Sequence, residues 1–296
     1  MPQLTPDPAL PPRLVRVGAR QRLVRGETRP PGATGEPLVV FGGDHAFGRD
    51  TERPWPARLA ERLGRPVLNL AVEGAGPAFP LDDAALLARA SGHAPVIVEA
   101  AGLWAVTNRW YAVGRRHPRR VTAASPTLRA LYDDLTLDGI TDLGRLLRLL
   151  VWRDPVRFEV VAQDVRAAWR IGAAALLTRL GPRAVLLTTP GATRLSAAGQ
   201  AAPALAARAA ADAGVRLALA QVADDPADAA ADAAAEAVLA GGRRGWGAVS
   251  SRHATARSAK PLAAEFSALS ASRVGHAASM SGHGSSRCWR AMNQAR

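Results

Sequence analysis

The residues best suited to chemistry stand in one glycine-rich stretch, LVVFGGDHAFGRD, from Leu38 to Asp50. An apolar run breaks there into two glycines and is followed at once by Asp44 and His45. A carboxylate beside an imidazole can act as an acid/base pair or can contact a ligand. A plainer interpretation is that Asp44 caps the following turn while His45 is solvated. We predict that Asp44 and His45 are the catalytic residues if the protein is an enzyme.

A second glycine turn, EGAG, follows the next apolar run, VLNLAV. Its glycines, Gly74 and Gly76, together with Gly43 of the first turn, can offer backbone N–H groups to an anion or a developing oxyanion. Glu73 at the start of this turn either faces the same cleft or lies on the surface. We predict ligand contacts at Gly43, Gly74 and Gly76.

Glu99 is a carboxylate inside a third apolar run, PVIVEA. It must be paired or lie near a strand end, because an isolated buried carboxylate is very costly in free energy. Arg109 is the candidate partner for this carboxylate.

The densest polar-aromatic group of the chain is NRWY, Asn108 to Tyr111. Aromatic faces beside amide and guanidinium donors suit a sugar ring or an anionic group. The alternative is that these aromatic residues, with Trp104, pack a long connection onto a sheet. The basic residues that follow could clamp phosphate, sulfate or carboxylate, or could form a solvated face: Arg115, Arg116, His117, Arg119 and Arg120. We predict ligand contacts at Asn108, Arg109 and Arg116.

An α/β scaffold is expected to position these residues. Apolar runs that end in glycine or polar residues alternate with segments of helical period, which is typical of a doubly wound, mostly parallel sheet of about five strands. Strands are predicted at 37–41, 67–72, 95–100, 184–189 and 215–222. Helices are predicted at 54–63, 81–90, 142–152, 155–180 and 195–213, with a further helix start at Ser125-Pro126. Residues 15–26 could add a short strand or hairpin at the sheet edge.

The composition is that of a globular protein, since 48% of the 296 residues are hydrophobic. The single cysteine, Cys288, excludes an intrachain disulfide and favours a reducing, cytoplasmic compartment. No apolar run is long enough to span a bilayer, and the proline-rich start is not a signal peptide. Neither glycine turn has the spacing of a phosphate loop or dinucleotide motif, and no spaced His/Cys cluster suggests a metal, so we expect no cofactor.

The formal net charge of +13 is concentrated at the carboxyl end. Residues 242–296 hold nine basic residues and one acidic residue, so they supply +8 of that charge. Because all but one of the basic residues are arginine, the charge is explained by GC-rich coding, and we expect no nucleic-acid partner. We expect an arm at 1–35, an α/β domain at 36–222 and a low-complexity, disordered tail at 223–296. A shifted reading frame or genuine degeneration could have produced such a tail.

The blocks GGDHAFG, WPARLAERLG, VLNLAVEGAG and VIVEAAG, in this order, resemble the opening blocks of the SGNH (GDSL-like) hydrolases. More closely, Phe41 to Arg120, followed by ASPTLRALY, is similar to an uncharacterised bacterial family related to that fold, domain of unknown function 6473. The resemblance covers roughly residues 15–188. It implies a three-layer fold of the SGNH-hydrolase or flavodoxin type, with its site at the carboxyl edge of the sheet.

The sequence departs from the SGNH pattern at each catalytic block. The family's serine position falls at Asp44 or His45, the asparagine of its Gly-x-Asn falls at Trp104, and no Asp-x-x-His follows Val222. A serine esterase needs a nucleophile, a base and oxyanion donors. We therefore favour a non-catalytic domain that binds an anionic or glycan small molecule. The alternative is a hydrolase or acyl-transfer enzyme acting on a small or carbohydrate ester through a non-standard site.

Overall fold

The structure is a computed structural model that describes residues 14–17, 21–49, 51, 53–93, 95–188, 201–220 and 225–244. All of these residues belong to one compact unit, Met1–Ala259. The predicted strand ends at 189 and 221–222, the helix start at 195–200 and the segment 245–296 lie outside the described residues.

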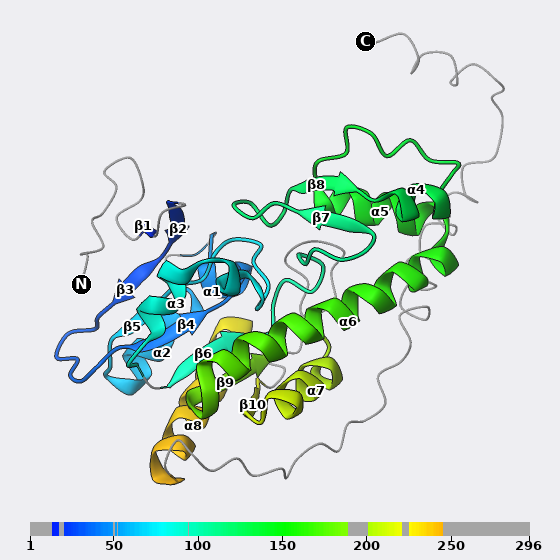
Figure 1. The fold of residues 1–296 in the computed structure, drawn as a ribbon. Coiled ribbons are helices and arrows are strands. Elements are labelled where there is room, and N and C mark those ends of the chain that lie inside the picture. Colours follow the sequence, from blue (N-terminus) through cyan, green and yellow to red (C-terminus); the bar gives the residue numbers. More distant parts are fainter. Residues whose placement is uncertain are drawn as a thin grey trace, which may run out of the picture. The chain divides into compact units, whose positions relative to one another are not determined.

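A six-stranded, mostly parallel sheet forms the centre of this unit (Figure 1). The strands are, in spatial order, β10 (Arg216–Leu219), β9 (Ala184–Thr188), β6 (Val96–Glu99), β4 (Leu38–Phe41), β5 (Val67–Asn69) and β3 (Gly26–Thr28). The five parallel strands lie in the order 2-1-3-4-5 when numbered along the chain, which is a common order of doubly wound sheets. The predicted mixed α/β fold with a mostly parallel sheet is confirmed.

The sixth strand, β3, is antiparallel to β5 and was not among the predicted strands. Its sequence, Gly-Glu-Thr, has no apolar run, so only its pairing with β5 identifies it as a strand. That hairpin consists of β1 (Val15–Val17) and β2 (Arg22–Val24), which pair antiparallel as the sequence suggested.

One face of the sheet is covered by α1 (Asp44–Phe47), α2 (Trp55–Leu63) and α8 (Pro226–Arg244). Trp55 and Leu59, four residues apart on α2, pack in a core with the strand residues Val185 and Leu187 and the alanines of α8. Helix α8 falls inside the stretch for which we expected a disordered tail. Its alanines allow a close approach to α2, which explains why a low-complexity segment is helical here.

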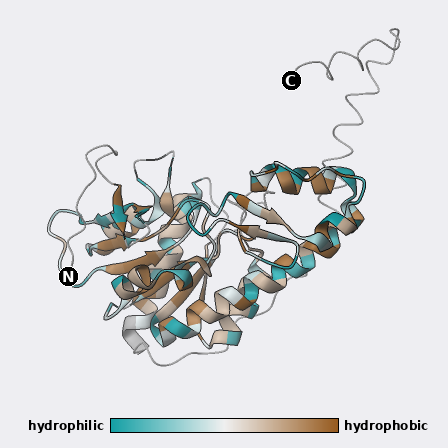
Figure 2. Cartoon of the chain, turned by 45° about the horizontal axis from the view of Figure 1, so that its top comes forward, coloured by the Kyte–Doolittle hydropathy of each residue, from teal (hydrophilic) through white to brown (hydrophobic). Residues whose placement is uncertain are grey.

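Most of the other helices follow the predictions within a few residues, but α7 (Pro203–Ala213) begins after residues 201 and 202, which were predicted to be helical. Helix α6 (Pro155–Leu180) packs with α7 (Pro203–Ala213) and β9, and Figure 2 shows hydrophobic and hydrophilic residues alternating along it. Asp83 caps α3 (Ala84–Ala90), so this helix begins later than predicted, after a 3-10 turn at Phe79–Asp82. Ser125 caps α4 (Pro126–Leu131) as expected. A hairpin of β7 (Tyr111–Val113) and β8 (Val121–Ala124) precedes α4, and α5 (Leu143–Arg153) precedes α6.

Candidate functional site

The candidate site lies where the order of strand addition reverses, next to β4. The chain proceeds from β4 to β5 on one side, whereas β6 pairs with the other side of β4, so the carboxyl ends of β4 and β6 form the switch point. Ligands of doubly wound sheets bind in the crevice outside this point. Asp44 and His45 follow β4 directly and Glu99 ends β6, so the structure brings these three predicted residues together.

Glu99 is fully buried, and Arg109 is not its partner. Its Oε2 accepts the backbone N–H of Gly43 at 2.9 Å and that of Ala46 at 3.3 Å. Its Oε1 lies 3.9 Å from Nδ1 of His45. Burial raises the pKa of the Glu99 carboxyl; His45 and the two N–H donors lower it, and Asp44 raises it again. Arg109, a candidate partner from the sequence, pairs with Asp164 instead, and the start of the adjacent helix supplies the donors to the Glu99 carboxylate.

The Asp44 side chain connects the two glycine turns to an arginine. Its Oδ1 accepts the Gly74 N–H at 2.8 Å, and its Oδ2 pairs with Nη2 of Arg119 at 2.9 Å. The other terminal nitrogen of Arg119 lies 2.9 Å from Glu73, which also pairs with Arg49 at 2.7 Å. Thus the backbone donors of Gly43 and Gly74 already have carboxylate acceptors within the protein.

The glycines also let the three turns approach one another. A Cβ on Gly43 would lie 2.7 Å from the Ala75 carbonyl oxygen, and one on Gly76 would lie 2.9 Å from the Gly102 carbonyl oxygen. Gly102 adopts φ +61°, where only glycine is relaxed. These contacts explain the glycines by packing, while a ligand contact at Gly76 stays a prediction.

The polar-aromatic group packs the long connection onto α6. Trp110 is 3% exposed and donates to Asp164 at 2.7 Å, and Tyr111 is 1% exposed and donates to the Trp104 carbonyl at 2.8 Å. Arg109 pairs with the same Asp164 at 2.6 Å and lies over the Trp110 ring. The packing interpretation therefore accounts for these aromatic faces, which are not open for stacking on a sugar.

Asn108 holds the turn that leads into β7. Its Oδ1 accepts the N–H of Trp110 at 2.8 Å and that of Tyr111 at 3.3 Å, while its Nδ2 donates to the Val106 carbonyl at 2.9 Å. Each of these contacts is local. The structure therefore places Asn108 and Arg109 in the packing of this connection, apart from the arginines described next.

A hollow of about 270 Å³ lies near the carboxyl ends of β4 and β5, and we call it the arginine pocket. It brings together Arg116, which the sequence predicted, and arginines from the first hairpin and the α1 turn that were not predicted. Its lining consists of Arg16, Gln21, Arg22, Leu23, Phe47, Arg49, Val72, Glu73, Arg116, His117, Pro118 and Arg119. Its volume lies just below the roughly 300 Å³ at which small-ligand pockets begin, so only a small ion or molecule fits in it.

Arg22 is a fully buried guanidinium on the wall of the arginine pocket. Its Nε donates to Asp83 at 2.5 Å, its Nη1 donates to the Arg115 carbonyl at 2.7 Å, and its guanidinium carbon stands 3.9 Å above the Phe79 ring. Its third nitrogen, Nη2, is buried without a hydrogen-bond partner among the described residues. Alternation predicts this inward position, since Arg22 and the buried Val24 share one face of β2.

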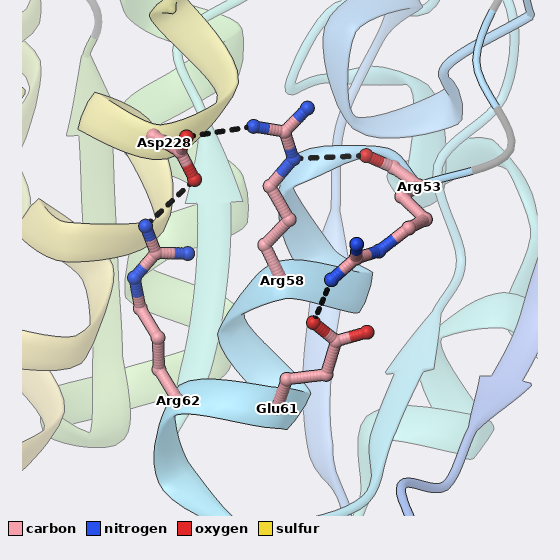
Figure 3. A pocket seen from close by; sticks show the side chains of 5 residues that line it. All are labelled: Arg53, Arg58, Glu61, Arg62 and Asp228. Atoms are coloured by element: carbon pink, nitrogen blue, oxygen red, sulfur yellow. Dashed lines mark hydrogen bonds and ion pairs between the residues drawn. The ribbon is translucent and has the colours of Figure 1, made fainter.

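A second hollow, of about 310 Å³, is lined by residues of α2 and α8 that form ion pairs with one another (Figure 3). Asp228 lies 2.9 Å from Arg58 and 2.7 Å from Arg62, and Arg53 pairs with Glu61. The two contacts of Asp228 join the helices, whereas Arg53 and Glu61 both belong to the α2 segment, so we assign this hollow to the helix contact and not to the candidate site.

The comparisons with known proteins identify a family. The family model "Domain of unknown function (DUF6473)" matches residues 5–269, which is most of the chain. No curated protein and no solved structure matches the chain. Among the described residues, no helix is long and apolar enough to cross a membrane. The match extends further in both directions than the resemblance over residues 15–188, and the chain belongs to the DUF6473 family.

Proposed function

We propose that this protein binds an anionic small molecule in the arginine pocket and does not use a serine-hydrolase mechanism. The observation that carries the proposal is the lining itself, in which five arginines face one carboxylate, Glu73. Guanidinium groups bind carboxylate and phosphate through paired N–H donors, and a shared wall of them attracts anions. The buried aromatic faces give no support to the glycan part of the earlier expectation, so the proposal is restricted to anions.

Isothermal titration calorimetry of the full chain with phosphate, sulfate and malonate tests this function. Arg116 is exposed on the pocket rim, so Arg116→Ala should weaken binding about fivefold without affecting folding. Arg148→Ala is the matched control, because Arg148 is an exposed arginine of α5 that does not line the arginine pocket. Equal losses in the two variants would show that anions bind through net charge alone.

A second candidate function is hydrolysis of a small ester. It is favoured by the buried Glu99 carboxylate facing the His45 imidazole, which is the relation of an orienting acid to a general base. We also propose that the fold is related to that of the SGNH hydrolases and that the protein is cytoplasmic. Turnover of a short-chain acyl ester that His45→Ala abolishes would support this candidate. Activity equal in the wild type and in His45→Ala would exclude it.

A further inference from the structure

We infer that the exposed face of α6 binds a second copy of this chain in an antiparallel, twofold-symmetric pair. None of the residues that line the arginine pocket belongs to α6, so this inference goes beyond the proposed function and does not depend on it. Three properties of α6 carry it: its exposed apolar residues, their spacing and the charges on either side of them.

The exposed face of α6 carries no charged residue from residue 156 to residue 178. The exposed residues of this segment are Val156, Val160, Gln163, Ala167, Ile171, Ala175 and Thr178, and its charged residues are partly buried at the sides of the face. Val156 is 78% exposed and Ile171 is 65% exposed, and Figure 1 shows α6 running along the outside of the unit. A surface helix normally turns charged and polar residues to solvent, so a face of this kind indicates a partner.

The spacing of these residues lets the face pair with itself. In an antiparallel twofold pair, residue i of one copy meets residue j of the other and j meets i, so the sum of the two residue numbers stays constant. The register that sets Val156 against the partner's Ile171 has the same sum for the next pair. It sets Val160 against the partner's Ala167, whose small side chain allows the helices to approach closely. Gln163 then lies beside the twofold axis, where its amide and that of its own copy can donate to each other.

The charged residues on one side of the face are complementary in the same register. Arg166 donates to Glu159 at 2.7 Å, so both lie on one side of α6, and Arg170 follows Arg166 one turn later. The twofold axis lies between the helices at a right angle to both, so it brings this side of each helix together. Glu159 is then level with position 168 of the partner, between the partner's Arg166 and Arg170. Opposite charges therefore meet at each end of the contact.

The other side of the face and its centre also favour a second copy over a membrane surface. Asp164 lies nearest the twofold axis on that side, and Arg109 balances it at 2.6 Å. Helices that lie in a membrane surface carry mainly basic residues beside their apolar face, whereas α6 has acidic and basic residues on both sides. The Gln163 amide needs a hydrogen-bond partner when it is covered, and a second Gln163 supplies one while lipid does not.

Sedimentation velocity of the full chain tests the pair. One helix per copy suits a dissociation constant in the micromolar range, so we expect monomers to become dimers between about 2 and 200 µM. Val160→Lys and Ala167→Glu should each weaken dimerisation at least about tenfold, because each copy then covers a charge with an apolar side chain. Both positions are exposed in the single chain, so the thermal unfolding of both variants should match the wild type.

Mixing the two variants tests the register. In the mixed pair, the introduced lysine at position 160 of one copy faces the introduced glutamate at position 167 of the other, and the second contact between these positions keeps its native residues. Dimerisation should return to within about threefold of the wild type. The matched control is a mixture of Val160→Lys with Ala175→Glu. Residue 175 lies about 12 Å further along the same face, so this mixture should stay monomeric.

The other results would overturn the inference. A chain that stays monomeric up to about 200 µM has no such pair. A dimer that both charged variants leave intact has its interface elsewhere. A dimer that the variants disrupt but that their mixture does not restore lacks the antiparallel register, and misfolded variants could not produce the restoration we expect.

Discussion

The resemblance to the SGNH hydrolases puts their serine position at Asp44 or His45, and the Asp44 carboxylate makes contacts within the protein. It accepts the Gly74 N–H, a donor that the sequence had suggested for a ligand, and it pairs with Arg119. A carboxylate that occupies a backbone donor in this way excludes a second anion from the same N–H. At this scale the residues at the strand ends therefore support binding at the neighbouring arginines more than acyl transfer.

The buried carboxyl of Glu99 should make stability depend on pH. Its pKa is raised in the folded protein, mainly by burial, so the folded state binds its proton more tightly than the unfolded state. The contribution of Glu99 to stability is then full below its unfolded pKa and is lost as pH rises through the folded pKa. Glu99→Gln lacks this loss, so its free energy of unfolding relative to wild type should increase from pH 4 to pH 8.

Urea denaturation of both proteins across that pH range measures the difference. Titrating groups distant from Glu99 are shared by the two chains and cancel in the comparison, whereas His45 and Asp44 interact with Glu99 and contribute to the measured difference. Parallel profiles would mean that the Glu99 carboxylate is ionised in the folded protein as easily as in the unfolded one.

Asn108 is expected to act through stability. Asn108→Ala removes the acceptor of two backbone N–H groups at the start of β7, and each unsatisfied donor typically costs about 1–3 kcal/mol. Because both contacts are part-buried and water can replace part of the lost acceptor, we expect a total loss of about 1–3 kcal/mol in the free energy of unfolding and an unchanged affinity for anions. If Asn108→Ala folds normally but no longer binds phosphate, Asn108 contacts the ligand and this prediction is wrong.

At the scale of elements, the long or strongly patterned segments are predicted well and the short ones are not. Helix α6 has the predicted bounds because its apolar residues repeat at helical spacing over many turns. Strands β3 and β7 are three residues long and carry too few residues for a period, so only their partners fix them. The arginine pocket could not be predicted from the sequence for the same reason, since its arginines come from separate short segments.

Helix α8 depends on small side chains for its contact with α2. Ala234 is fully buried in that contact, so Ala234→Leu should overpack it and lower the free energy of unfolding by about 1–3 kcal/mol. Amide protection in α2 should fall as well, because the two helices share one apolar core. Leu239→Ala, on the exposed side of α8, is the control and should change neither quantity. Equal protection of α2 in all three proteins would refute the shared core.

At the scale of the whole molecule, one sheet joins segments from both halves of the described chain. Trp55 packs on one face with α8, and Trp169 of α6 donates to the Ala101 carbonyl at the end of β6. We therefore expect a single urea transition, with the same midpoint by tryptophan fluorescence and by far-ultraviolet circular dichroism. Two separate midpoints would show that the layers unfold independently.

The fold class follows from the sequence because strand and helix patterns alternate along it, whereas the partners of each site residue depend on contacts distant in sequence. Arg22 and Asp83 lie 61 residues apart, and Asp44 and Arg119 lie 75 apart. No local pattern encodes such pairs. The position of the site at the carboxyl edge and the inward direction of Arg22 could thus be anticipated, while the partners of Arg22 and the place of Arg49 in the arginine pocket could not.

The placement of α8 has a consequence for how the chain is made. The central strand β4 is complete at Phe41, but α8, which covers its face of the sheet together with α2, ends only at Arg244. At a synthesis rate of about 5–20 residues per second, a ribosome needs roughly 10–40 seconds to deliver the last helix after the first parallel strand. During that interval the apolar side of α2 has no cover from this helix. Chaperone dependence during translation should therefore fall only after α8 has left the exit tunnel.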